Sequence, residues 1–98
     1  MEFNDLKIFL HLANSRHFSK TAGQNHMSPS TLSRQIQRLE EELGQPLFIR
    51  DNRQVTLTGT GELFLPFAQQ QWQQWQQFKQ QLLTDSAQLV GELRLFCS

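Results

Sequence analysis

Apolar residues near the start of the chain recur with the spacing of an α-helix. Positions i, i+3, i+4 and i+7 are occupied by Leu6, Phe9, Leu10 and Ala13. Residues with this spacing lie on one helix face, so the pattern predicts a first helix that buries this face. Asn4 or Asp5 can cap its start, and the stretch NSRH ends it.

A second, shorter helical pattern begins at Phe18 and Ala22, with Ser19 as its expected N-cap. Gly23 and Asn25 weaken this helix. Glycine costs roughly 1 kcal/mol relative to alanine in a helix interior. The chain is then expected to turn before a third helix.

Ser28 and Pro29 give a strong start signal for that third helix. The serine oxygen can cap free N–H groups, and proline at the first helical position loses no hydrogen bond. A continuous apolar stripe follows, formed by Leu32, Ile36, Leu39 and Leu43. Gly44 is the expected stop. The glutamates at 40–42 oppose the helix dipole, and the sequence gives no reason for them beyond solvation or pairing with a neighbour.

Two short β-prone segments come next, at residues 46–49 and 55–57, and the polar stretch 50–54 separates them. This arrangement predicts a β-hairpin. Three short helices followed by a hairpin indicate a mainly α fold, a winged helix-turn-helix domain over residues 1–58.

A long fourth helix is predicted after this domain, with Thr58 as its cap and its end near Thr84. It contains a heptad seam made of Phe64, Ala68, Gln71, Trp75, Phe78 and Leu82. A stripe with this many aromatic residues must be covered, so we expect this helix to pack against the winged domain or a partner. The alternative is a disordered, aggregation-prone glutamine tract.

The charges are distributed unevenly, although the net charge of the 98-residue chain is zero. Between Leu6 and Leu39 no residue is acidic, whereas five are basic: Lys7, Arg16, Lys20, Arg34 and Arg38. A locally basic face is typical of phosphate binding, although an ordinary solvated face gives the same pattern. No apolar run could span a membrane and no signal peptide is visible. The single cysteine, Cys97, fits a reducing cytoplasm.

The outer face of the third helix is the candidate for contact with nucleic acid. Opposite the leucines lie Ser30, Thr31, Arg34, Gln37 and Arg38, with Ser33 and Gln35 on the flanks. Small side chains let the backbone approach closely, arginine can bind guanine or phosphate, and glutamine can pair with adenine. The helix dipole and the free N–H groups also favour an anion. Arg50 and Arg53 in the hairpin turn could follow the sugar-phosphate backbone or enter a minor groove.

An ordered set of residues extends through these elements. It consists of Phe18-Ser19 with Ala22, Ser28, Ser33-Arg34-Gln35-Ile36, Leu39-Glu40, Leu43-Gly44, Leu47-Phe48-Ile49-Arg50, and Leu57-Thr58 with Gly61. With this set the chain resembles the DNA-binding domain of LysR-type transcriptional regulators. The stretches HLANSRHF, SPSTLSRQIQRLEE, LGQPLF and GELRLFCS are similar to members that control a branched-chain amino acid biosynthesis gene.

The resemblance implies roles for the matching positions. The expected base or groove contacts are Ser30, Thr31, Arg34 and Gln35. The expected backbone contacts are Lys20, Thr21, Ser33 and Arg38, and the expected wing contacts are Arg50 and Arg53. The resemblance also implies that the linker helix, 59–85, pairs with its twin into a homodimer on double-stranded DNA. Residues 86–98 would be a hinge and the start of an effector domain. Only that domain would bind a small-molecule inducer, and no cofactor is expected.

Two positions depart from the family pattern. Many members have glutamine after the capping serine, where this chain has Pro29, so Ser30 or Thr31 must supply that readout. Most members have leucine where this chain has Asn25, so the packing of the second helix depends on whether Met27 fills the gap.

An enzyme is not expected, because no metal-ligand spacing, nucleophile constellation or glycine-rich phosphate loop joins the three histidines, His11, His17 and His26. Two other functions stay open. One is a winged domain that binds an acidic protein instead of DNA, and the other is a structural coiled-coil adaptor.

Overall fold

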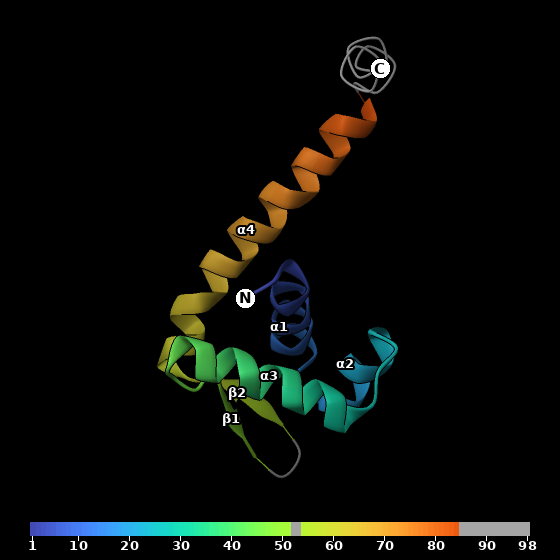
Figure 1. The fold of residues 1–98 in the computed structure, drawn as a ribbon. Coiled ribbons are helices and arrows are strands. Elements are labelled where there is room, and N and C mark those ends of the chain that lie inside the picture. The colour runs from blue at the N-terminus through green and yellow to red at the C-terminus, as the bar shows by residue number, and fades with distance from the viewer. Residues whose placement is uncertain (52–53, 85–98) are drawn as a thin grey trace.

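A computed structural model describes residues 1–51 and 54–84 of the chain. The described elements are α1 (Phe3–Ser15), α2 (Phe18–Gln24), α3 (Pro29–Leu43), β1 (Phe48–Arg50), β2 (Val55–Leu57) and α4 (Gly59–Thr84) (Figure 1). This order confirms the predicted winged helix-turn-helix followed by a long helix. Arg53, Cys97 and the hinge and effector-domain start expected at 86–98 lie outside the described residues.

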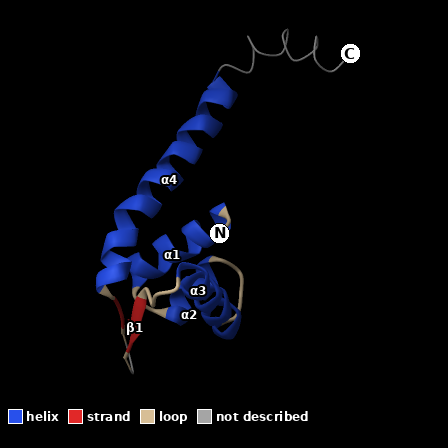
Figure 2. Cartoon of the chain, turned by 60° about the vertical axis from the view of Figure 1, so that its left-hand side comes forward, coloured by secondary structure: helices blue, strands red, loops and turns tan. Residues whose placement is uncertain are grey.

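Helix α1 is the centre of the domain and contacts the other three described helices (Figure 2). Its buried side chains are Leu6, Ile8, Phe9 and Leu12. The sequence predicted a single buried face that included Leu10 and Ala13, but these two are only partly buried. The prediction was incomplete because other helices surround α1, so its apolar positions are covered from more than one side.

The predicted start and end of α3 are confirmed. The Ser28 hydroxyl accepts a hydrogen bond from the Thr31 N–H at 3.2 Å, and Pro29 is the first helical residue. Gly44 ends the helix with a φ of 77°, in the left-handed region that favours glycine.

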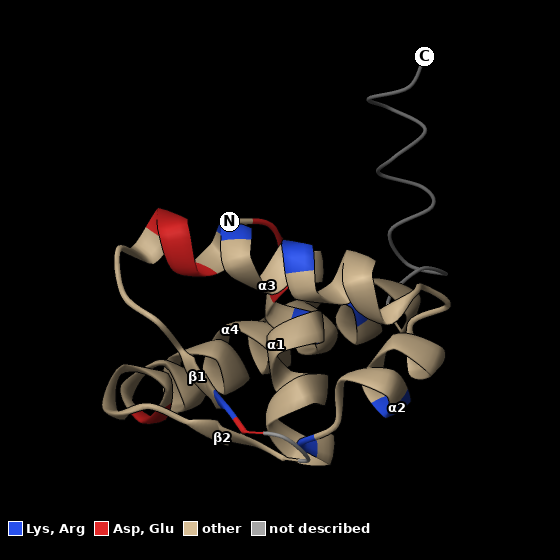
Figure 3. Cartoon of the chain, turned by 90° about the horizontal axis from the view of Figure 1, so that it is seen from below, with Lys and Arg blue, Asp and Glu red and all other residues tan. Residues whose placement is uncertain are grey.

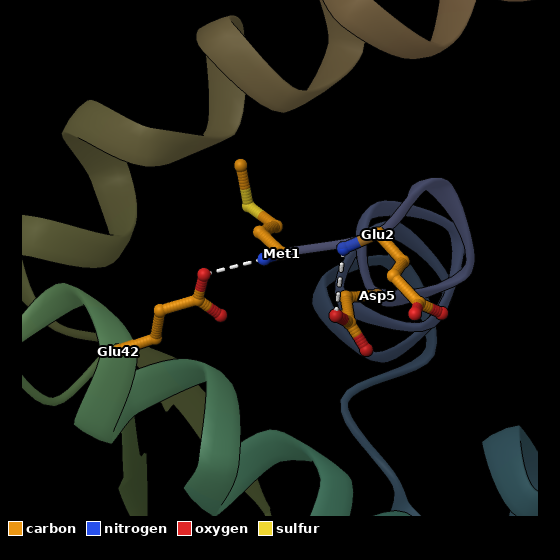
Figure 4. A network of polar contacts seen from close by, with 4 residues as sticks. All are labelled: Met1, Glu2, Asp5 and Glu42. Carbon is orange, nitrogen blue, oxygen red and sulfur yellow. Dashed lines mark hydrogen bonds and ion pairs between the residues drawn. The ribbon is translucent and has the colours of Figure 1, made fainter.

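The caps predicted for α1 and α2 were placed too far along the chain. Helix α1 begins after Glu2, whose N–H donates to the Asp5 carboxylate at 3.0 Å (Figure 4). Helix α2 begins after His17, so Ser19 already lies inside it. In both cases the first helical residue precedes the polar residue expected to cap the helix.

The β-hairpin is the predicted wing. Its antiparallel register is Phe48↔Leu57, Ile49↔Thr56 and Arg50↔Val55. Phe48 and Val55 are buried, whereas Ile49 faces outward and is 55% exposed. In α3, the Glu40 Oε2 atom accepts the N–H groups of Leu47 at 2.7 Å and Phe48 at 3.3 Å. One of the three unexplained glutamates therefore fixes the entry of the chain into the wing.

Helix α4 begins against the wing and then extends away from the domain (Figures 1 and 2). The predicted cap is confirmed, because the Thr58 hydroxyl accepts the Gly61 N–H at 2.9 Å. A Cβ atom on Gly61 would lie 2.2 Å from the Leu47 carbonyl oxygen and 2.9 Å from a Leu57 methyl carbon. Only glycine therefore lets α4 pass this close to the wing. In the described part of the chain, no helix combines the length and apolar character needed to cross a membrane.

The first part of α4 packs on α1. The Phe64 and Phe9 rings meet edge to face with centroids 4.8 Å apart, and Ala68 is fully buried. Phe64 and Ala68 were expected at the dimer interface, and this prediction was wrong because the chain's own domain covers both. The helix continues through Pro66 to Thr84.

Candidate nucleic-acid interface

The outer face of α3 is polar and open to solvent. Its exposed residues are Ser30, Thr31, Arg34, Gln37 and Arg38. No acidic residue precedes Glu40 in this helix, and the acidic residues gather at its C-terminal end (Figure 3). The face therefore presents hydroxyl, amide and guanidinium groups near the positive end of the helix dipole.

Three hydroxyl groups gather at the N-terminus of α3. The Ser28 Oγ atom lies 2.9 Å from Thr31 Oγ1 and 3.3 Å from Ser30 Oγ. A hydroxyl has one donor and two acceptor positions, so these groups retain capacity for hydrogen bonds to a ligand. The cluster faces solvent and has the donors that an anion or a base edge requires.

The two glutamines near the middle of α3 differ in direction. Gln37 shares the exposed face with Ser30 and Arg34, to which its helical spacing aligns it. The Gln35 Oε1 atom is buried, with no hydrogen-bond partner among the described residues. Gln35 and Arg38 line a hollow between α1 and α3 that also contains the acidic residues Glu2, Asp5 and Glu42. The structure thus places Gln35 on the flank, as its helical spacing predicts, with its amide oxygen buried and not on the exposed face. Helical spacing places Gln37, and not Gln35, on the same exposed face as Ser30 and Arg34.

The opposite flank of α3 faces the wing. The Arg50 Nη1 atom donates a hydrogen bond to the Ser33 hydroxyl at 2.6 Å. The same guanidinium lies over the Phe18 ring in α2, 4.8 Å from its centroid. Two residues expected to contact DNA, Arg50 and Ser33, are therefore hydrogen-bonded to each other. Arg53 lies outside the described residues.

Lys20 and Thr21, both expected at phosphate, have different environments. Lys20 is exposed on α2, whereas Thr21 is fully buried. The Thr21 hydroxyl forms a hydrogen bond with the Ser15 hydroxyl, and so links α2 to α1. The prediction for Thr21 was wrong, because a phosphate cannot reach this side chain.

The unusual Asn25 has polar partners. Its side-chain amide donates to the Thr21 carbonyl at 2.8 Å and lies 3.1 Å from His11 Nδ1. Met27 is partly buried and packs against the core. Asn25 is therefore accommodated by a hydrogen bond to His11 in α1. No three His, Cys, Asp or Glu side chains in the described parts of the chain could together hold a metal ion.

The start of the chain is tied to α3. The Met1 amine forms an ion pair with the Glu42 carboxylate (Figure 4). The hydrogen bond to Glu42 raises the pKa of the Met1 amine above its ordinary value. A second of the three glutamates is thus paired, and it holds the beginning of α1 against the end of α3.

Helix α4 also has a surface of large apolar side chains that the domain does not fully cover. The α4 apolar surface, as defined here, consists of Phe67, Trp75, Phe78 and Leu82 from α4 with Phe3 from α1. Phe78 is 52% exposed and Leu82 is 45% exposed. Trp75 is half-buried and stacks on Phe3 with ring centroids 4.8 Å apart. Of the expected seam, Gln71, Trp75, Phe78 and Leu82 thus remain accessible to a partner.

A family comparison covers most of the domain. The model described as "Bacterial regulatory helix-turn-helix protein, lysR family" matches residues 3–62. The HTH-type transcriptional activator IlvY of Haemophilus influenzae is 69% identical over all 98 residues, which are 34% of that protein. The HTH-type transcriptional regulator IlvY of Escherichia coli is 60% identical over the same 98 residues, or 33% of its length. The chain therefore spans about a third of the length of these relatives.

Solved structures share the fold. A complex of CbnR_DBD with DNA superposes with a TM-score of 0.80 at 30% identity, over 88% of this chain and 99% of that one. A BenM_DBD complex with catB site 1 DNA gives a TM-score of 0.81 at 33% identity, over 90% and 94% of the two chains. Both similar domains were crystallised on DNA.

Proposed function

Because the chain belongs to the lysR family of bacterial regulatory helix-turn-helix proteins, we propose that it binds specific double-stranded DNA as a homodimer and regulates transcription. The observation that carries this proposal is the exposed face of α3, which has hydroxyl, amide and guanidinium groups and no acidic residue before Glu40. In helix-turn-helix proteins the N-terminal part of the second helix enters the major groove.

The residues divide between bases and backbone according to their direction. Ser30, Thr31 and Arg34 would contact base edges, with Gln37 in the place expected for Gln35. Arg34 has the geometry for guanine, and a glutamine amide suits adenine. Phosphate contacts would come from Lys20, Ser33 and Arg38, and from Arg53 in the wing.

The homodimer would form through the α4 apolar surface. A contiguous exposed set of aromatic and aliphatic side chains is stable in water only when it is covered, and a second copy offers an identical set. Two symmetry-related α3 helices would then read an interrupted inverted repeat, whose spacing equals the distance between the helices.

The target proposed from the relatives is a branched-chain amino acid biosynthesis gene, because chains named IlvY match along the full length of this one. The chain would act in the cytoplasm as the DNA-binding region of a regulator and not as an enzyme. Response to a small-molecule inducer would belong to a further effector domain, since this chain spans only a third of those relatives.

Binding-site selection from random duplexes tests the proposal. The purified chain should enrich an interrupted inverted repeat, and affinity should fall steeply with salt. Arg34→Ala should abolish the enrichment, whereas the matched control Lys7→Ala, on α1, should preserve it. A single half-site would remove the homodimer from the proposal. No enrichment by the folded protein would favour the protein-binding winged domain.

A further inference from the structure

Arg50 lies where three elements meet. It is the last residue of β1, its Nη1 atom donates to Ser33 in α3 at 2.6 Å, and its guanidinium covers the Phe18 ring in α2 at 4.8 Å. A charged donor forms one of the stronger protein hydrogen bonds, and a guanidinium over an aromatic face adds a cation–π contact. One side chain therefore connects the wing to both helices of the helix-turn-helix.

The wing needs such a connection. Each strand has three residues, and an isolated two-stranded hairpin is marginally stable in water. Most of the wing's polar anchors lie at its base, where Glu40 binds the Leu47 and Phe48 N–H groups and the Thr58 N–H donates to the Leu47 carbonyl at 3.0 Å. Arg50 is at the other end of β1, next to the turn, where its side chain adds to the hydrogen bond that the N–H of the opposite residue, Val55, donates to the Arg16 carbonyl oxygen at 3.1 Å.

The bond to Arg50 also orients Ser33. The hydroxyl oxygen accepts the guanidinium N–H, so the hydroxyl proton remains available for donation to another group. Ser33 lies on the flank of α3 that faces the wing, beside the exposed face that we assign to DNA. A phosphate beside that flank would be an acceptor for this proton.

We propose that Arg50 is a positioning residue for DNA binding: it holds the wing against α2 and α3 and directs the Ser33 hydroxyl toward a phosphate. This rests on the proposed function. Its contribution to affinity comes through Ser33 and Phe18 and not through neutralising a phosphate by its own charge. A lysine at this position would keep the positive charge but could not replace the guanidinium group, because its ammonium group has neither the planar arrangement of donors nor a flat face that stacks on a ring.

A double-mutant cycle with Arg50→Ala and Ser33→Ala separates this role from a direct phosphate contact. We expect each variant to weaken binding of the selected duplex by about tenfold, and the double variant to bind no more weakly than Arg50→Ala alone. Arg50→Lys should fail to restore affinity. The slope of log affinity against log salt should be unchanged. The matched control Lys20→Ala should add its effect to that of Ser33→Ala and flatten the slope.

The proposal would be overturned by any of three results. The losses of affinity in Arg50→Ala and Ser33→Ala could be additive, Arg50→Ala could reduce the slope of log affinity against log salt by about 0.9, or Arg50→Lys could bind as tightly as the unmodified chain. Phe18→Leu provides a second route if Arg50→Ala unfolds, because it keeps apolar packing but removes the ring beneath the guanidinium. It should weaken DNA binding and accelerate amide exchange of β1 and β2 without DNA, and unchanged exchange would contradict the proposal. Failure of the unmodified chain to bind any duplex would instead remove the proposed function itself.

Discussion

Helix α4 has two parts with the same apolar spacing and different surroundings. In the inner part, 59–72, Phe64 and Ala68 are buried against the domain, whereas in the outer part, 73–84, Phe78 and Leu82 are about half exposed. Helix α1 has 13 residues and α4 has 26, so at a common rise per residue α1 can cover only half of α4. The periodicity identifies an apolar face, and the length of the neighbouring helix decides how much of that face the chain itself can bury.

Two phenylalanines offer the sharpest test of this difference. Phe64→Ala should lower the free energy of unfolding by about 3–5 kcal/mol, because it leaves a cavity beside Phe9. Phe78→Ala should change it by less than about 1 kcal/mol in the monomer, since this ring is 52% exposed. Urea unfolding at protein concentrations below the dimer dissociation constant measures both. Equal losses would mean that the two parts do not differ.

Two glycines at the start of α4 test how closely the inner part approaches the wing. Gly61→Ala should destabilise the chain by about 1–3 kcal/mol, because its Cβ atom meets the Leu47 carbonyl oxygen at 2.2 Å. Gly59→Ala is the matched control, since no atom lies within 4 Å of the added Cβ, and it should be neutral or slightly stabilising. Thermal unfolding of both variants distinguishes them, and a harmless Gly61→Ala would contradict the close approach.

The outer part can be changed without affecting the inner part. Leu82→Gln should weaken the proposed homodimer by about tenfold or more, because it replaces an exposed apolar side chain of the α4 apolar surface with a polar one. The free energy of unfolding of the monomeric variant should be nearly unchanged. Sedimentation equilibrium measures the effect, with Gln80→Ala, at another exposed position of the outer part, as the control. A dimer that survives Leu82→Gln intact would locate the interface elsewhere.

The smallest effect is expected at the start of α1. The hydrogen bond to Glu42 raises the pKa of the Met1 amine from its ordinary value of 8.0, so its stabilisation is present below pH 8.0 and is lost as pH rises through the folded-state pKa. Glu42→Gln should remove this alkaline loss. Urea midpoints at neutral and strongly alkaline pH compare the two chains. An identical alkaline loss in Glu42→Gln would show that the ion pair contributes nothing.

Features governed by neighbouring residues were predictable from the sequence. Ser28 with Pro29 gave the start of α3, Gly44 gave its end, and Thr58 gave the cap of α4, because each acts on backbone groups within a few residues. The exposed face of α3 followed from helical spacing opposite a leucine stripe. These elements were sufficient to derive the winged helix-turn-helix order.

Features that depend on distant partners were not predictable. Thr21 is a polar residue whose burial depends on Ser15 in another helix, and Glu40 binds the wing entrance seven residues further along. The burial of the Gln35 amide oxygen depends on the packing of α1 against α3. Apolar spacing likewise could not separate Phe64, which the domain covers, from Phe78. In each case the missing information was which element lies next to the side chain.

The hydrogen bond between Asn25 and His11 has an evolutionary consequence. Replacing Asn25 alone by leucine would leave His11 Nδ1 facing a methyl group, and replacing His11 alone by leucine would deprive the amide of one acceptor. Either single step passes through an unpaired polar atom in a partly buried site, whereas the double change restores an apolar contact. The two positions should therefore covary across descendants of this domain, and a lineage with leucine at the first is expected to have lost the imidazole at the second.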